Sequence, residues 1–107
     1  DDMLIIRGVN LLPSQIESVL LEMDETTPHY LLIVDRLNNL DTLELQVEVE
    51  DRFYSDTIGE LQNLRKKIQH QVESSTGLSV NVKLVEPKTL ERSEGKARRV
   101  IDKRKLF

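Results

Sequence analysis

The pair Gly95-Lys96 is the feature of this 107-residue sequence best suited to chemistry. A glycine lets the backbone turn sharply, and the lysine after it extends a compact cation that can meet an anionic group on a partner. The pair lies in a basic stretch, because residues 83–105 hold nine Lys and Arg against four acidic residues, while the rest of the chain is acidic. Such a segment suits a phosphate-bearing partner or an acidic surface of a larger protein, although most exposed lysines are simply solvated.

Other polar side chains are weaker candidates for a site. His29 and His70 are far apart in the sequence, so we expect surface or packing roles rather than metal binding or proton transfer. Glu44, Glu48 and Glu50 share one face of a predicted strand and could hold a hard cation. A solvated face is favoured, because metal sites usually collect ligands from several elements. The chain contains no Cys, which excludes disulfides, thiolate metal sites and a Cys nucleophile.

Hydrophobic periodicity and turn residues predict the elements that must position these side chains. Short apolar runs interrupted at Arg7-Gly8 predict a tight β-hairpin, and Pro13 suits the first turn of a helix. Asn38-Asn39 tolerates left-handed backbone angles and predicts a turn between two strands. We expect strands at 3–6, 9–12, 29–34, 43–49 and 78–84, and helices at about 13–23 and 55–77.

The order of these elements predicts an α+β fold. Ser55 or Asp56 can cap the second helix, and Gly77 is well placed to end it. The βαββαβ order is typical of a ferredoxin-like antiparallel sheet with two helices on one face, here with an N-terminal β-hairpin and a charged C-terminal segment. Met3 and Met23 occupy apolar positions and are expected in the core.

The length is that of one domain with a single core. The sequence starts at Asp1 without an initiator Met, a leader or an apolar run of about 18 residues that would span a bilayer. We therefore expect a soluble, cytoplasmic fragment of a longer protein, spanning one domain over residues 1–107.

The C-terminal stretch carries a family resemblance. Pro87-Lys88-Thr89, followed by Gly95-Lys96 and by Arg99, resembles the closing motif of adenylate-forming enzymes. Five residues separate Thr89 from Gly95 where most of that superfamily has two. Residues 93–96 and 100–104 are similar to the corresponding residues of the phenylacetate–CoA ligase branch. The longer spacing therefore points to that branch within the superfamily.

The N-terminus carries an independent resemblance over residues 1–17. Asp1, followed after six intervening residues by Gly8 and then by Pro13 to Glu17, is similar to the hinge motif of the same superfamily. Gln15 stands where many relatives have Glu, again as in the phenylacetate branch. The same Arg7-Gly8 pair also reads as an ordinary hairpin turn, and both interpretations can hold together.

The resemblance implies specific roles for these residues. Lys96 is implied to be catalytic in forming an acyl-adenylate, with Gly95 and Arg99 supporting its motif. Asp1 is implied to be the hinge, and Arg7 and Gly8 to form the loop that faces the thiol substrate. The whole enzyme is implied to be an acid–CoA ligase that uses ATP, coenzyme A and Mg²⁺, activates an aryl-acetic acid and alternates between two domain arrangements.

The resemblance also implies what this chain lacks. The acid pocket, the main nucleotide site and the magnesium ligands are implied to lie in a large N-terminal domain of the same polypeptide. We therefore expect no metal or cofactor to bind this domain alone and the isolated fragment to be inactive. A homodimeric parent is compatible with the sequence, and neither nucleic acid nor a membrane is an expected partner.

Two other functions remain open at this point. A regulatory ligand-binding module with the same βαββαβ order needs no catalytic Lys, but it leaves residues 87–105 unexplained. An RNA-binding sheet would stack bases on aromatic side chains, yet the sheet strands are acid-rich and the chain has only four aromatic residues. These are Tyr30, Phe53, Tyr54 and Phe107.

Overall fold

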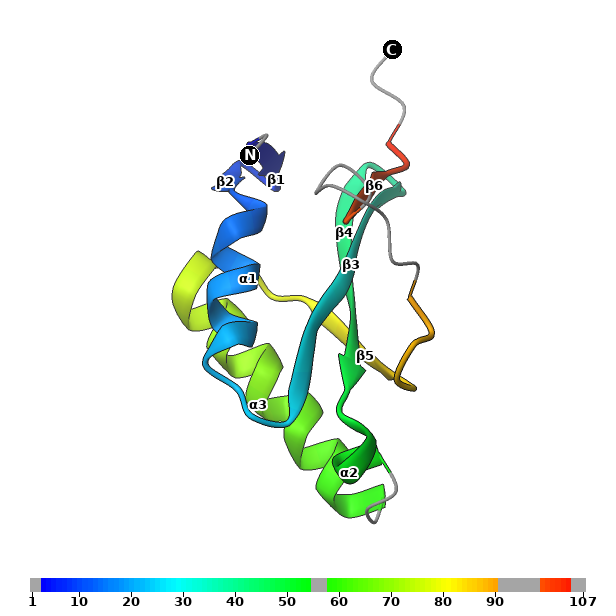
Figure 1. Cartoon of the computed structure of the whole chain (residues 1–107). Coiled ribbons are helices and arrows are strands. Elements are labelled where there is room, and N and C mark those ends of the chain that lie inside the picture. Colours follow the sequence, from blue (N-terminus) through cyan, green and yellow to red (C-terminus); the bar gives the residue numbers. More distant parts are fainter. Residues whose placement is uncertain (1–2, 55–57, 91–98, 105–107) are drawn as a thin grey trace.

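The computed structural model describes residues 3–54, 58–90 and 99–104. A four-stranded sheet forms one layer, and helices α1 (Pro13–Leu21) and α3 (Ile58–Thr76) cover one of its faces (Figure 1). The two helices contact each other, α1 packs on β3 (Thr26–Leu37), and α3 packs on β5 (Asn81–Val85). The expected α+β class with two helices on one face is confirmed.

Two antiparallel pairs are closed by two-residue turns. Strands β1 (Leu4–Ile6) and β2 (Val9–Leu11) form the N-terminal hairpin across Arg7-Gly8. Strand β3 pairs with β4 (Leu40–Val49) across Asn38-Asn39. All four turn residues have positive φ, which is the pattern of type I′ turns whose twist matches that of the flanking strands.

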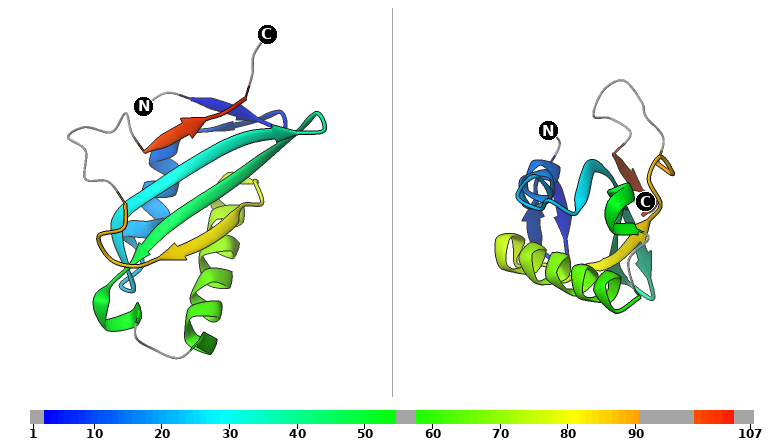
Figure 2. Two further views of the ribbon diagram at one scale, coloured as in Figure 1. Left: turned by 90° about the vertical axis from the view of Figure 1, so that its right-hand side faces the viewer. Right: turned by 60° about the horizontal axis from the view of Figure 1, so that its bottom comes forward.

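The sheet is mixed, and this corrects the expected antiparallel arrangement. Its order is β5-β4-β3-β6, with β6 formed by Val100–Asp102 (Figure 2, left). Only β3 and β4 are antiparallel, whereas β5 runs parallel to β4 and β6 runs parallel to β3. Helix α3 carries the chain back before β5 begins, so β5 starts at the same end of the sheet as β4.

The first strand of the expected βαββαβ order lies outside this sheet. The β1–β2 hairpin is a two-stranded sheet of its own. The outer position next to β3 is taken by β6, a three-residue strand in the charged segment for which no apolar period predicted a strand. Tertiary pairing with the polar segment thus completes the sheet.

Helix positions agree with the sequence apart from their ends. Helix α1 begins at Pro13, where the Gln15 side chain accepts a hydrogen bond of 2.8 Å from the Leu12 backbone N–H. Residues 51–54 form a separate short helix, α2 (Asp51–Tyr54), before α3. Helix α3 ends at Thr76, and Gly77 follows it with a φ of 78° that glycine readily adopts. The proposed caps Ser55 and Asp56 lie outside the described residues.

The core lies between the helices and the sheet. Met23 is buried as expected, but Met3, which precedes β1, is 54% exposed. No helix in the described ranges is long and apolar enough to cross a membrane. The fully buried side chains of the core come from the hairpin, both long helices and the two central strands: Ile6, Leu11, Ile16, Leu32, Val34, Leu45, Val47, Val49, Ile68 and Val72.

Candidate functional site

The Arg7-Gly8 turn projects from the N-terminal hairpin. Arg7 has φ of 49° and Gly8 has φ of 77°. A Cβ built on Gly8 would meet no atom within 4 Å, so the space beside Gly8 is open and only the backbone angle favours glycine there. The turn can therefore present its backbone closely to a partner molecule.

Polar contacts attach this turn to the sheet. The Arg7 backbone N–H donates to Asp41 Oδ2 at 3.1 Å, and its guanidinium donates to the Ser79 carbonyl at 2.8 Å. Asp41 is 9% exposed and also accepts from Arg36 Nε at 2.9 Å. The Arg7 N–H, and after it the Arg36 hydrogen bond, hold the pKa of Asp41 below its ordinary value, so Asp41 is a carboxylate at neutral pH.

Arg104 joins the turn to the end of the described chain. Its side chain is 7% exposed, and Nη1 donates to Asp41 Oδ2 at 3.2 Å and to the Ile5 carbonyl at 2.6 Å. Its Nε and Nη2 donate to the two oxygens of Asp102 at 2.9 and 2.8 Å, which lowers the pKa of that carboxyl. A planar guanidinium suits several acceptors at once, so Arg104 links the hairpin, the start of β4 and β6.

A hollow of about 320 Å³ lies beside this cluster. Arg7 and Arg36 contribute cationic side chains to its lining, and Asp41 contributes a carboxylate. A partner group entering the hollow would meet charged side chains next to the Arg7-Gly8 backbone. The remaining lining residues are Asn39 of the β3–β4 turn and Leu40 at the start of β4.

Arg99 lies at the other motif segment. Its Nη1 donates to Glu17 Oε1 at 3.0 Å, and its guanidinium carbon lies 5.4 Å from the centre of the Tyr30 ring. Burial raises the pKa of the Tyr30 hydroxyl, which keeps the ring neutral. The Arg99 carbonyl accepts from the Leu32 N–H at 2.8 Å, so backbone pairing with β3 begins at Arg99, one residue before β6. Both motifs therefore meet, because Glu17 belongs to the N-terminal one.

Three of the predicted site residues are not placed. Asp1, Gly95 and Lys96 lie outside the described residues. The segment leading toward Lys96 is described as far as Leu90, and it contains a second unusual turn. Thr89 N–H donates to the Glu86 carbonyl at 3.2 Å, with Pro87 and Lys88 between them and φ of 64° at Lys88. This is the pattern of a type II turn, which normally has glycine or asparagine where Lys88 lies.

Glu48 holds this second turn, and its position corrects the expectation of a solvated strand face. Its residue is 0% exposed, and its two oxygens accept from the backbone N–H groups of Lys88 and Leu90, each at 2.9 Å. The chain after β5 folds back over this end of β4 and covers Glu48. Glu44 remains partly exposed, so the alternating pattern of the strand did not distinguish the two glutamates. Only Pro87, as a turn signal, indicated that the chain changes direction here.

The other candidates assemble no centre. His70 is exposed and His29 is half-buried, with its backbone N–H bonded to Thr27 Oγ1 at 3.1 Å. No group of three or more His, Asp or Glu side chains suited to a metal occurs within residues 3–54, 58–90 and 99–104.

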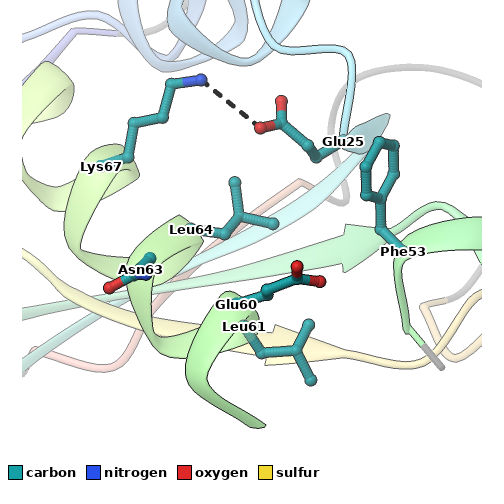
Figure 3. A pocket seen from close by; sticks show the side chains of 7 residues that line it. All are labelled: Glu25, Phe53, Glu60, Leu61, Asn63, Leu64 and Lys67. Carbon is teal, nitrogen blue, oxygen red and sulfur yellow. Dashed lines mark hydrogen bonds and ion pairs between the residues drawn. The ribbon is translucent and has the colours of Figure 1, made fainter. Parts of the chain in front are cut away.

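A second cavity of about 320 Å³ is lined by residues of α2 and α3 and by Glu25 (Figure 3). Helix α2 and the start of α3 lie at the far end of the molecule from the hairpin (Figure 1). Lys67 and Glu25 form an ion pair of 3.4 Å at its edge, and Phe53 and Leu64 line it (Figure 3). None of the motif residues contributes to this cavity. Sequence reasoning did not anticipate this cavity, because its lining comes from α2, α3 and the connection before β3.

Comparison with known proteins assigns the fold to a family. The family model described as AMP-binding enzyme C-terminal domain matches residues 8–104. Phenylacetate-coenzyme A ligase of Thermus thermophilus is 44% identical, over 98% of this chain and 26% of the relative. The chain spans about a quarter of the length of the curated relatives it matches.

Solved structures agree with this assignment. A domain of phenylacetate-coenzyme A ligase from Bacteroides vulgatus has a TM-score of 0.92 and 36% identity, covering 100% of this chain and 97% of that one. A 2-hydroxyisobutyryl-CoA ligase in complex with 2-HIB-AMP and CoA, in the thioesterification state, has a TM-score of 0.92 and 34% identity, covering 100% of this chain and 22% of that one. The family match over residues 8–104, together with these relatives, shows that this chain belongs to the AMP-binding enzyme C-terminal domain family.

Proposed function

We propose that this chain is the C-terminal domain of an ATP-dependent acid–CoA ligase of the phenylacetate–CoA ligase type. In the first half-reaction, the acid carboxylate attacks ATP, giving acyl-AMP and pyrophosphate. In the second, the thiol of coenzyme A displaces AMP and gives acyl-CoA. The similarity to phenylacetate-coenzyme A ligases over 97–99% of this chain supports the proposal.

One structural observation carries this proposal furthest. The Arg7-Gly8 hairpin and the residues that follow the Gly95-Lys96 motif come from opposite ends of the chain, yet they are joined by the hydrogen bond between Arg104 and the Ile5 carbonyl. Arg99 and Glu17 form a second link between the same two motifs. A regulatory module with this fold would need neither link, whereas a domain that serves two half-reactions needs both motifs fixed within the same domain.

The proposed roles follow from charge and backbone shape. The Lys96 ammonium offsets negative charge that develops as the acid carboxylate and the ATP phosphate react. The Arg7-Gly8 turn, with open space beside Gly8, lies along the approach of the thiol. Asp1 is the pivot at which the domain rotates to present one motif and then the other. Gly95 and Arg99 support the motif that carries Lys96.

The proposal assigns the remaining parts to the rest of the enzyme. A large N-terminal domain of the same polypeptide holds the acid pocket, the main nucleotide site and the magnesium ligands, and it is the partner of this domain. The acid is an aryl-acetic acid, and the reaction takes place in the cytoplasm. A homodimeric parent is part of the same proposal, and the 107-residue chain by itself is expected to be inactive.

Separate assays of the two half-reactions test these roles in the full-length enzyme. Lys96→Ala should abolish most acid-dependent ATP–pyrophosphate exchange and leave thioester formation from supplied acyl-AMP largely intact. Gly8→Leu should do the reverse. Gly8→Ala is the matched control, because it imposes the same positive-φ strain without a long side chain in the thiol path.

Two results would contradict the assignment. Equal loss of both half-reactions in Lys96→Ala would indicate a folding role for Lys96, and normal thioester formation in Gly8→Leu would make the turn purely structural.

Asp1→Pro should slow one half-reaction far more than the other, because fixing φ near about −65° favours one domain arrangement. Pyrophosphate exchange with a panel of aryl and aliphatic acids then identifies the substrate class.

A further inference from the structure

Four non-glycine residues have positive φ in the described part of the chain: Arg7, Asn38, Asn39 and Lys88. Asparagine adopts this conformation readily because its short polar side chain bonds locally. Arginine and lysine have no such advantage, so their conformation must be imposed by surrounding contacts. Arg7 belongs to the N-terminal motif, and Lys88 belongs to the C-terminal one.

The same kind of contact holds both basic residues. The Arg7 backbone N–H donates to Asp41 at 3.1 Å, and the Lys88 backbone N–H donates to Glu48 at 2.9 Å. Both carboxylates are buried, with residue exposures of 9% and 0%. Hydrogen bonds from backbone N–H groups to carboxylates are stronger than those between neutral groups, and burial excludes the water that would compete.

Asp41 and Glu48 lie near opposite ends of β4. Asp41 pairs with Arg36 beside the β3–β4 turn, and Glu48 pairs with Val85 at the end of β5. The two residues are seven positions apart on an extended strand, which corresponds to roughly 23 Å. Figure 2 (left) shows β4 in the middle of the sheet, running from the N-terminal hairpin toward α2. One rigid strand thus connects the supports of two distant turns.

Additional contacts direct each carboxylate toward its turn. Asp41 accepts from Arg36 and from Arg104, which itself holds the Ile5 carbonyl just before Arg7. Glu48 accepts a second N–H, from Leu90, so its two oxygens bracket the turn at Lys88. Removing either carboxylate leaves its turn without the contact that stabilises its unusual backbone.

We propose that Asp41 and Glu48 are positioning residues for different half-reactions, Asp41 holding the Arg7-Gly8 turn for thioester formation and Glu48 holding the Lys88 turn for adenylation. This inference rests on the proposed function. Neither carboxylate is proposed to contact a substrate. Each acts through the backbone of one motif, and β4 keeps both motifs in place on the same domain.

The test measures both half-reactions in full-length enzymes carrying Asp41→Asn or Glu48→Gln. Both changes preserve side-chain size but remove the charge and one acceptor oxygen. Asp41→Asn should slow thioester formation from supplied acyl-AMP by about 10- to 100-fold, because small misplacements of a reacting group have effects of that size. Pyrophosphate exchange should change less than about twofold in this variant, and Glu48→Gln should give the opposite pattern.

Two neighbouring carboxylates provide matched controls. Asp35→Asn alters the strand beside Asp41, where Asp35 accepts from the Arg36 N–H, and Glu44→Gln alters the same face of β4 as Glu48. Both should leave the two half-reactions near wild-type rates. In the 107-residue chain, amide hydrogen exchange should accelerate at Arg7 in Asp41→Asn and at Lys88 and Leu90 in Glu48→Gln.

A glycine provides a rescue that a general folding role would not predict. In Glu48→Gln/Lys88→Gly, glycine adopts positive φ without help, so adenylation should recover at least partly relative to Glu48→Gln. If Glu48→Gln alone does not fold, the double variant takes its place in the assays of the two half-reactions. No recovery by the glycine would overturn the positioning role of Glu48.

The outcomes separate this inference from the proposed function. If Lys96→Ala and Gly8→Leu fail to divide the half-reactions, the proposed function fails. If those two variants do affect different half-reactions, the proposed function stands and the positioning roles are tested separately. The positioning roles are overturned if Asp41→Asn and Glu48→Gln lower both half-reactions equally, change neither, or show the reverse pattern. The positioning roles are supported if Asp41→Asn slows only thioester formation, Glu48→Gln slows only adenylation, and amide hydrogen exchange accelerates only at the turn whose carboxylate was changed.

Discussion

The Asn38-Asn39 turn and the Arg7-Gly8 turn have the same length and the same signs of φ but different means of support. Asparagines at 38 and 39 are residues that type I′ turns favour, so the first turn is specified locally. The second has arginine at its first position, which that turn type does not favour. Contacts from Asp41 and Ser79 compensate for it.

The turn at Lys88 extends this comparison. Its positive φ also occurs at a basic residue, and its carboxylate support, Glu48, is likewise contributed by β4. Both turns that depend on distant residues belong to the motifs proposed to act in catalysis, whereas the locally specified turn does not. Such departures from local preference are expected where a backbone must be held in a shape that function requires.

The largest effect should come from removing the support of Lys88. Glu48→Ala removes the buried carboxylate that accepts two backbone N–H groups of a partly buried turn, and we expect a loss of about 2–5 kcal/mol in the free energy of unfolding. Urea unfolding of the 107-residue chain measures it. Glu44→Ala on the same strand face should cost less than about 1 kcal/mol, since Glu44 is partly exposed and bonds to Gln46. Equal losses in the two variants would remove the distinction between these glutamates.

Removing the support of Arg7 should cost less and should depend on pH. The pKa of Asp41 is lowered in the folded chain, first by the Arg7 N–H and then by Arg36. Its stabilising contribution is therefore complete above the ordinary Asp pKa of about 4 and is lost as pH falls through the lowered folded value. Stability should decline less steeply below about pH 4 in Asp41→Asn than in the wild type.

Thermal unfolding of both proteins between about pH 2 and pH 6 checks this dependence. Asp102, whose pKa is also lowered, is present in both and supplies the same kind of acid sensitivity to each. At neutral pH, Asp41→Asn should lower stability by about 1–3 kcal/mol, because one carboxylate bonded to three donors is lost. Parallel pH profiles would mean that Asp41 contributes no linked stability.

Exchanging residue types between the turns should have a moderate effect. Asn38→Arg places an arginine at φ of 53°, where its N–H has no carboxylate partner among the described residues. We expect a cost of about 1–2 kcal/mol, measured by chemical denaturation. Asn38→Gly is the control, because it keeps the favoured turn chemistry and should be close to neutral. A neutral Asn38→Arg would show that arginine needs no support in this turn.

The smallest effect on stability should come from Arg7→Asn. Asparagine relieves the strain at φ of 49°, but the hydrogen bond from the guanidinium to Ser79 is lost. These changes oppose each other, so we expect a net shift within about 0.5 kcal/mol in urea unfolding. A large loss would mean that the guanidinium, rather than the backbone N–H, is the main support of the turn.

Sequence patterns alone determined the local parts of this fold. Pro13 and the apolar period that follows it predict α1, the alternating residues of β4 predict a strand with one polar face, and Gly77 predicts the end of α3. The two turn pairs were also recognisable, since Arg7-Gly8 and Asn38-Asn39 each interrupt apolar runs. Local dihedral preferences and hydrophobic period act over a few residues, so they can be read without knowing the tertiary structure.

Only the tertiary structure decided what covers each surface. The sequence pattern of β4 does not distinguish Glu44 from Glu48, because both lie on its polar face. In the structure, the chain after β5 packs against Glu48, and two of its backbone N–H groups donate to the Glu48 oxygens. The pairing of β6 with β3 and the shared hydrogen bonds of Arg104 likewise join residues far apart in sequence. An alternating pattern specifies which side a residue faces, whereas burial and charge pairing depend on which distant segment arrives there.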